Sequence, residues 1–251
     1  MHDDDLTILE AEMDLADPLD QLAPLEEETG PQYDADDMLP LLTSSNSQQR
    51  MLAARAFCEL EDARAIPALT QLLDDACPLV RVSAAYALGR NHDDAAVEAL
   101  ILRLRKDWNG YVRKGVVWAL GNSRSAQSLL PLVEALRTDI AAVRLWAASA
   151  LAQMTQVSYE AVVACLPPLI ETMRRDAVAP VRSNCAWAIG ELCRELPSNV
   201  VYNTAIDSLI ETFAEDDDLG VREDARSAIL KVGDARGLQT VEEIEQDGYL
   251  I

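Results

Sequence analysis

The sequence is poor in the residues that build catalytic and metal-binding sites. Of its 251 residues, 5% are aromatic, two are histidine and ten are glycine. It contains no CxxC pair, glycine-rich phosphate loop, HExxH motif or serine-centred nucleophile motif. An enzyme needs a positioned acid, base or nucleophile, so this shortage argues against catalysis by the chain alone. We therefore expect no catalytic residue and no bound cofactor.

Long apolar runs are also absent. No stretch reaches the roughly 18 consecutive apolar residues of a membrane span, and the first residues, MHDDDLTILE, lack the features of a signal peptide. We expect a soluble, cytoplasmic protein. The cysteines are odd in number, which indicates reduced thiols rather than a disulfide framework: Cys58, Cys77, Cys165, Cys185 and Cys193.

Basic residues are missing from the N-terminal part of the chain. The first Lys or Arg is Arg50, and residues 1–35 carry twelve Asp or Glu. This concentration of one charge predicts a mobile acidic tail over residues 1–35. The whole chain has a formal charge of -22, which argues against nucleic acid or an anionic membrane surface as the main partner. A basic or neutral protein is the partner that this charge favours.

The sequence does contain a repeated segment in which Val-Arg begins a helix of small residues. Five copies read VRVSAAYALG, VRKGVVWALG, VRLWAASALA, VRSNCAWAIG and VREDARSAIL, and a weaker sixth begins at Gln49. The arginines of the six copies are separated by 31, 32, 31, 38 and 40 residues. A period of this length is typical of stacked helix pairs.

Each unit combines a Leu-rich first helix with the Val-Arg second helix. The pattern predicts an all-α protein, an α-solenoid built as a right-handed superhelix of about six helix pairs over residues 36–240. Residues 241–251 are expected to form a C-terminal cap or tail. Gly89, Gly121 and Gly190 stand near the ends of three second helices, and we expect them to adopt the left-handed conformation of a helix cap.

The segments DDACPLVRVSAAYALG, WNGYVRKGVVWALG and RRDAVAPVRSNCAWAIG resemble the HEAT-repeat superfamily, in particular its phycobilisome-lyase-like repeats. The resemblance covers roughly residues 36–240 and implies a HEAT-like solenoid. Together with its acidic leader, the chain looks most like cyanobacterial HEAT-repeat proteins that partner an A-type iron–sulfur carrier. A fold alone does not choose among functions.

Three functions are compatible with this resemblance. The first is a non-catalytic scaffold or adaptor that assists iron–sulfur cluster assembly, or another protein assembly step, in a cyanobacterium. The second is a bilin lyase subunit of the phycobilisome type, or an adaptor that binds a phycobiliprotein. The third is a protein that itself binds an iron–sulfur cluster.

The resemblance also implies a structural ladder of hydrogen bonds between stacked repeats. It joins the Asp that ends a first helix to the Arg of the Val-Arg pair. The implied pairs are Asp75 with Arg81, Asp107 with Arg113, Asp139 with Arg144, and Asp176 with Arg182, and Arg222 stands at the same position in the last copy.

Cysteines are the residues through which the chain itself would hold a cluster. Cys165, Cys185 and Cys193 fall within one predicted helix pair, and cluster ligation by them needs a fourth ligand from elsewhere. The alternative is core packing, because Cys185 occupies the position of Ala84 and Val116 in sister repeats.

Aromatic and basic residues give the stronger argument for binding. They form the residue mix of interface hot spots in an otherwise acidic protein, although some rings are equally suited to fill the seam between repeats. We also hypothesise that the acidic tail covers this surface until a partner displaces it. The predicted protein-binding surface comprises Trp108, Tyr111, Arg113, Lys114, Trp118, Arg144, Trp146 and Trp187.

Overall fold

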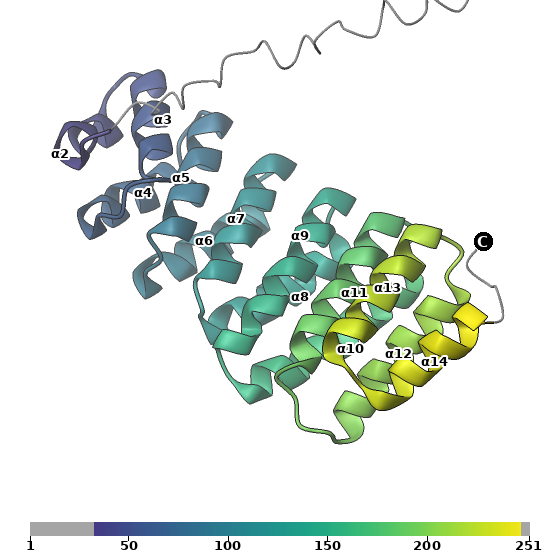
Figure 1. Ribbon diagram of the computed structural model, residues 1–251. Coiled ribbons are helices and arrows are strands. Elements are labelled where there is room, and N and C mark those ends of the chain that lie inside the picture. Colours follow the sequence, from purple (N-terminus) through teal and green to yellow (C-terminus); the bar gives the residue numbers. More distant parts are fainter. Residues whose placement is uncertain (1–32, 247–251) are drawn as a thin grey trace, which may run out of the picture. The chain divides into compact units, whose positions relative to one another are not determined.

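A computed structural model describes residues 33–246, which fold entirely as helices and connecting segments (Figure 1). Within this range there is no strand, and no helix is long and apolar enough to cross a lipid bilayer. Most of the predicted acidic tail lies outside the described residues. Its last residue, Ala35, packs against the core.

First and second helices alternate along the chain, which confirms the predicted α-solenoid. The first helices are α4 (Ile66–Leu72), α6 (Asp94–Lys106), α8 (Leu129–Thr138), α10 (Tyr159–Arg175) and α12 (Val200–Glu215). The second helices are α3 (Ser47–Ala56), α5 (Pro78–Arg90), α7 (Gly110–Asn122), α9 (Ala141–Ala152), α11 (Ala179–Cys193) and α13 (Leu219–Val232). The short helices α2 (Ala35–Met38) and η1 (Pro40–Thr43) precede α3 and complete the first of six pairs. Three further 3-10 turns are η2 (Ala63–Ala65), η3 (Ala126–Ser128) and η4 (Gln153–Gln156).

The wider spacing of the last two units lengthens their first helices. Helix α10 has 17 residues and α12 has 16, whereas α8 has 10. Helix α10 also contains Pro167 and Pro168 in its interior. The extra residues thus extend the helices and leave the order of elements unchanged.

The core is a continuous apolar seam between the two helix layers. Successive second helices pack directly on one another, α5 on α7, α7 on α9, α9 on α11 and α11 on α13 (Figure 1). Small residues face one another there: the alanines that lie against glycines of the neighbouring second helix are Ala85, Ala119, Ala150 and Ala228. Small side chains let helix backbones approach closely, so the second-helix layer is the more tightly packed one.

The three repeat glycines serve this close approach, and the prediction that they adopt left-handed caps is wrong. Gly89, Gly121 and Gly190 lie inside α5, α7 and α11, and among the described glycines only Gly233 has a positive φ, 76°. A Cβ on Gly121 would lie 2.8 Å from Ala150 Cβ and 2.9 Å from its Cα. Glycine is needed here because the backbone of the next helix fills the space of a side chain.

A single helix, α14 (Ala235–Gln246), follows the last pair and packs on α12 and α13. It buries Gly237 and Val241 and leaves Leu238 exposed, as expected of a capping element. This helix spans residue 240, where the sequence predicts the boundary between the solenoid and the C-terminal cap or tail. Residues 247–251 lie outside the described part of the chain.

Two glycines of the same helix test the close-packing argument. We expect Gly121→Ala to lower the free energy of unfolding by about 1–3 kcal/mol, since α7 and α9 would have to move apart. Gly115→Ala is the matched control, because its Cβ would make ordinary contacts of 3.4 Å with Tyr86 and 3.6 Å with Ala85. It should be neutral or stabilising by up to about 1 kcal/mol through helix propensity. Urea unfolding followed by circular dichroism measures both, and equal effects would contradict the argument.

Candidate protein-binding surface

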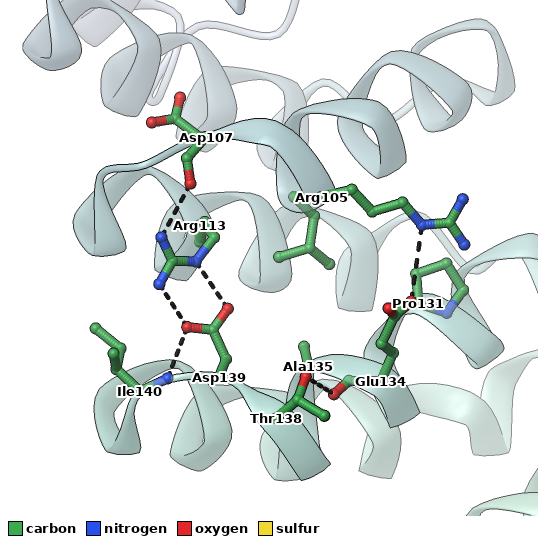
Figure 2. A pocket seen from close by; sticks show the side chains of 10 residues that line it. Arg105, Asp107, Arg113, Pro131, Glu134, Ala135, Thr138, Asp139 and Ile140 are labelled. Atoms are coloured by element: carbon green, nitrogen blue, oxygen red, sulfur yellow. Dashed lines mark hydrogen bonds and ion pairs between the residues drawn. The ribbon is translucent and has the colours of Figure 1, made fainter.

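One arginine from each second helix except the last, α13, connects its own repeat to the next. Figure 2 shows Arg113, whose Nη1 donates to the main-chain oxygen of Asp107 at 2.9 Å. Its Nε and Nη2 donate to the carboxylate of Asp139 at 2.7 and 2.6 Å. One guanidinium therefore satisfies a carbonyl at the end of its own first helix and a carboxylate of the following repeat.

The same arrangement recurs along the stack. Bidentate pairs join Arg81 to Asp107, Arg144 to Asp176 and Arg182 to Asp216, and Arg50 donates to Asp75 at 2.6 Å. Each of these aspartates also accepts a main-chain N–H of the turn that follows it. At the last copy Arg222 donates to the carbonyl of Phe213 instead, at 2.8 Å. The ladder is thus a chain of charge-assisted hydrogen bonds from one repeat to the next.

The ladder contains the residues named by the resemblance from Asp75 to Arg182, together with Arg50 and Asp216, and its carboxylate pairs join each arginine to the following repeat. Arg81 bonds the main-chain oxygen of Asp75 at 2.9 Å, whereas its carboxylate partner is Asp107. The four implied pairs are therefore hydrogen-bonded, but through the main-chain oxygen of the aspartate, and the carboxylate of each arginine's ion pair comes from the next repeat. The partner carboxylate lies 26 residues further along the sequence, where stacking brings it alongside.

Burial and hydrogen bonding shift the pKa values of the ladder aspartates in opposite directions. Burial of Asp107 raises its pKa, but the hydrogen bonds from Arg81 and from the N–H of Asn109 outweigh this effect, and its pKa is lowered. The pKa values of Asp75, Asp176 and Asp216 are lowered in the same way. These carboxylates are therefore charged at neutral pH and hold their arginines in place.

Two arginines of the predicted binding surface belong to this ladder. Arg113 and Arg144 are engaged with Asp139 and Asp176, so their guanidinium groups already have partners within the fold. The other residues of the predicted binding surface, the aromatic residues and Lys114, have no part in the ladder.

The most exposed aromatic side chains of the described residues lie where the turn after α6 leads into the first residues of α7. Trp108 and Tyr111 are each 77% exposed. Asn109 fixes the turn, because its side chain accepts the N–H groups of Tyr111 and Val112 as the N-cap of α7. The Asn109 cap therefore fixes the backbone that carries these two solvent-exposed rings.

Sequence reasoning missed two exposed apolar residues in the repeats on either side. Leu79 is 61% exposed and Ile140 is 52% exposed; Leu79 occupies the position of Tyr111 in the preceding repeat, and Ile140 is the N-cap residue of α9. Ile140 Cδ1 would lie 2.5 Å from a Cβ placed on Gly110, so it lies directly against the turn. Alignment of the repeats on the Val-Arg pair would have found Leu79. We call Leu79, Trp108, Tyr111 and Ile140 the turn patch.

The other predicted aromatic residues have different environments. Trp118 is half-buried, with its ring centroid 5.3 Å from that of Tyr86 and its edge in the space above Gly89. It fills the seam between repeats. Lys114 Nζ lies 4.9 Å from the ring centroid of Trp146, a cation–π contact between α7 and α9. Trp187 is exposed on α11.

The three candidate cluster ligands are core residues. Cys165, Cys185 and Cys193 are buried, and burial raises the pKa values of Cys165 and Cys193 to about 12. A metal ligand must be a thiolate, so this environment disfavours ligation. In residues 33–246 no group of three or more His, Cys, Asp or Glu side chains is placed to hold a metal ion.

The fold and the ladder define the class of the protein as an α-solenoid of two-helix repeats. The HEAT repeat profile matches residues 35–107 and 97–167, and a second HEAT repeat profile matches residues 165–196. The chain therefore belongs to the HEAT repeat family. No curated protein matches the sequence at a significant level.

Solved structures share this fold at low sequence identity. An engineered protein of the Northeast Structural Genomics Consortium is 25% identical, with a TM-score of 0.59 over 80% of this chain and 98% of its own. A designed armadillo repeat protein in complex with the peptide (KR)4 is 21% identical, with a TM-score of 0.57 over 80% and 100%. The complex of CpcE and CpcF of phycocyanin lyase from Nostoc sp. PCC7120 is 21% identical, with a TM-score of 0.59 over 88% and 85%.

The ladder makes a prediction about acid stability. We expect Asp107→Asn to lower the free energy of unfolding at pH 7 by about 3 kcal/mol, because it leaves the buried Arg81 without its counter-charge. The pKa of Asp107 is lowered in the folded state, so its contribution is present above the unfolded pKa of about 3.9 and is lost as pH falls through the folded value. The difference between wild type and variant should therefore shrink at pH 3.

Glu171→Gln is the matched control for this prediction. Glu171 pairs with Arg137 of the neighbouring first helix at 3.3 Å, and both side chains are 51% exposed. Loss of such a surface pair should cost less than about 0.5 kcal/mol. Urea unfolding at both pH values gives the comparison. A cost for Asp107→Asn that is as small as the control, or that does not change with pH, would contradict the role of the ladder.

Proposed function

We propose that the protein is a non-catalytic adaptor that binds a protein client through its turn patch. The observation that carries this proposal is the exposure of Trp108 and Tyr111, 77% each, on a capped and rigid turn. Large aromatic side chains held in water dominate binding energy when a partner covers them, and a rigid turn reduces the entropy lost on binding.

The repeats themselves provide an internal comparison. The position of Trp108 is occupied by Ala76, Ala177 and Asp217 in other units, and that of Tyr111 by Ala142, Pro180 and Gly220. A turn of this kind therefore folds without aromatic residues. This supports a role for the two rings in contact with another molecule rather than in the fold.

The client that we propose is an A-type iron–sulfur carrier. The support is the resemblance of the repeats and of the acidic leader to HEAT-repeat proteins that partner such carriers. We further propose that the chain holds no cluster of its own, because its three clustered cysteines are packed in the core as neutral thiols. A bilin lyase-type role predicts a phycobiliprotein as the client instead.

Isothermal titration calorimetry with a purified apo A-type carrier tests the proposal. We expect wild-type protein to bind, and Trp108→Ala/Tyr111→Ala to weaken binding about 30-fold or more, since truncation of two hot-spot aromatics costs at least about 2 kcal/mol. Phycocyanin serves as the second titrant. Binding of phycocyanin in place of the carrier would move the protein to the lyase-type role.

Leu130→Ala/Val200→Ala is the matched control. Leu130 and Val200 are 75% and 80% exposed on first helices, so this variant also removes two exposed apolar side chains but leaves the turn patch intact. Its affinity should equal that of the wild type. If both double variants bind equally well, the turn patch is not the binding surface.

A further inference from the structure

A second surface of the stack carries carboxylates, whereas the turn patch consists of apolar and aromatic side chains. A groove runs along the second helices α9, α11 and α13, and it is lined by Leu145, Pro180, Asn184, Trp187, Asp218 and Asp224 together with small residues. Its lining contains two carboxylates and no Lys or Arg. It therefore differs from the turn patch in both location and charge.

The oxygen atoms of this groove can accept further hydrogen bonds. Among the described residues, neither Asp218 nor Asp224 forms an ion pair; Asp218 only accepts the N–H groups of Gly220 and Val221 as the N-cap of α13. Asn184 donates its amide hydrogens to Leu145 O and Ser149 Oγ, both at 2.6 Å. These bonds fix the amide and leave its oxygen without a described donor.

An aromatic face completes the site. Trp187 is 37% exposed, and in residues 33–246 no cation lies over its ring. The same layer of helices shows what such a ring accepts, since Lys114 of α7 lies over Trp146 of α9. At Trp187 the fold provides carboxylates beside the ring but no cation of its own.

We propose that this groove binds a cationic side chain, an arginine or lysine of a basic peptide segment. A guanidinium stacks on an indole face while its edge donates to carboxylate and amide oxygens, and the groove presents both features together. The chain carries a formal charge of -22, which favours approach of a basic segment. This inference stands independently of the client bound by the turn patch.

The experiment uses the full chain and a fluorescein-labelled octapeptide of alternating Arg and Gly at physiological ionic strength. Fluorescence anisotropy gives the affinity. We expect Trp187→Ser to weaken binding about fivefold through loss of the cation–π contact. Serine is a conservative choice for the fold, because Ser149 and Ser227 occupy the same position in other repeats. Asp218→Asn/Asp224→Asn should weaken binding about tenfold through loss of two charge-assisted hydrogen bonds, and Asn retains the N-cap of α13.

The control must separate a site from general attraction to an acidic protein. Glu98→Gln/Glu160→Gln removes the same two charges from exposed positions on α6 and α10, and we expect it to change the affinity less than twofold. In an NMR titration of 15N-labelled protein, the indole signal that is missing in Trp187→Ser should shift more than those of the other three tryptophans.

Each outcome decides the proposal. Selective loss of affinity in the groove variants together with a shift of the Trp187 indole supports it. Equal weakening by the control variant, an unmoved Trp187 signal, or no binding of the peptide by wild type would overturn it. Trp108→Ala/Tyr111→Ala should leave peptide binding unchanged, so this result is distinguishable from failure of the turn-patch proposal.

Discussion

The structure depends on one repeated contact, a guanidinium that bonds its own turn and the carboxylate of the next repeat. Arg113 illustrates it: one edge holds the carbonyl of Asp107 and the other holds Asp139. Because the contact is bidentate and largely removed from water, it fixes both the spacing and the rotation between neighbouring repeats. Apolar packing alone is non-directional and would not define that register.

Close packing of the second helices determines which positions of the stack are left at its surface. Where Gly121 meets Ala150, the helices approach too closely for any larger side chain. The positions that point away from the seam carry no part of that packing, so they are free to differ between repeats. Such variable positions carry Trp108 and Tyr111 in one region of the stack. In another region they carry Trp187 and Asp224. The stack thereby supports two surfaces of different chemistry on one rigid frame.

The sequence alone is enough to predict the repeats and the helix order, because these recur at a readable period, and the resemblance to HEAT repeats named most of the ladder residues. It paired Arg81 with Asp75 and did not predict the carboxylate of Asp107 as a partner, since stacking, and not sequence proximity, brings Asp107 alongside. Sequence reasoning also misjudged Gly121, because a glycine near a helix end is compatible with a left-handed cap or with the approach of another backbone. Only the position of the next helix distinguishes the two. The sequence pattern of one repeat does not specify the contacts between repeats.

A double-mutant cycle between Arg113 and Asp139 tests the central claim most directly. The free energies of unfolding of wild type, Arg113→Ala, Asp139→Ala and the double variant give the coupling between the two side chains. If the guanidinium joins adjacent repeats as described, the coupling is about 1.5–3 kcal/mol, the range for hydrogen bonds to charged groups. A coupling near zero, with each variant destabilising independently, would contradict the account.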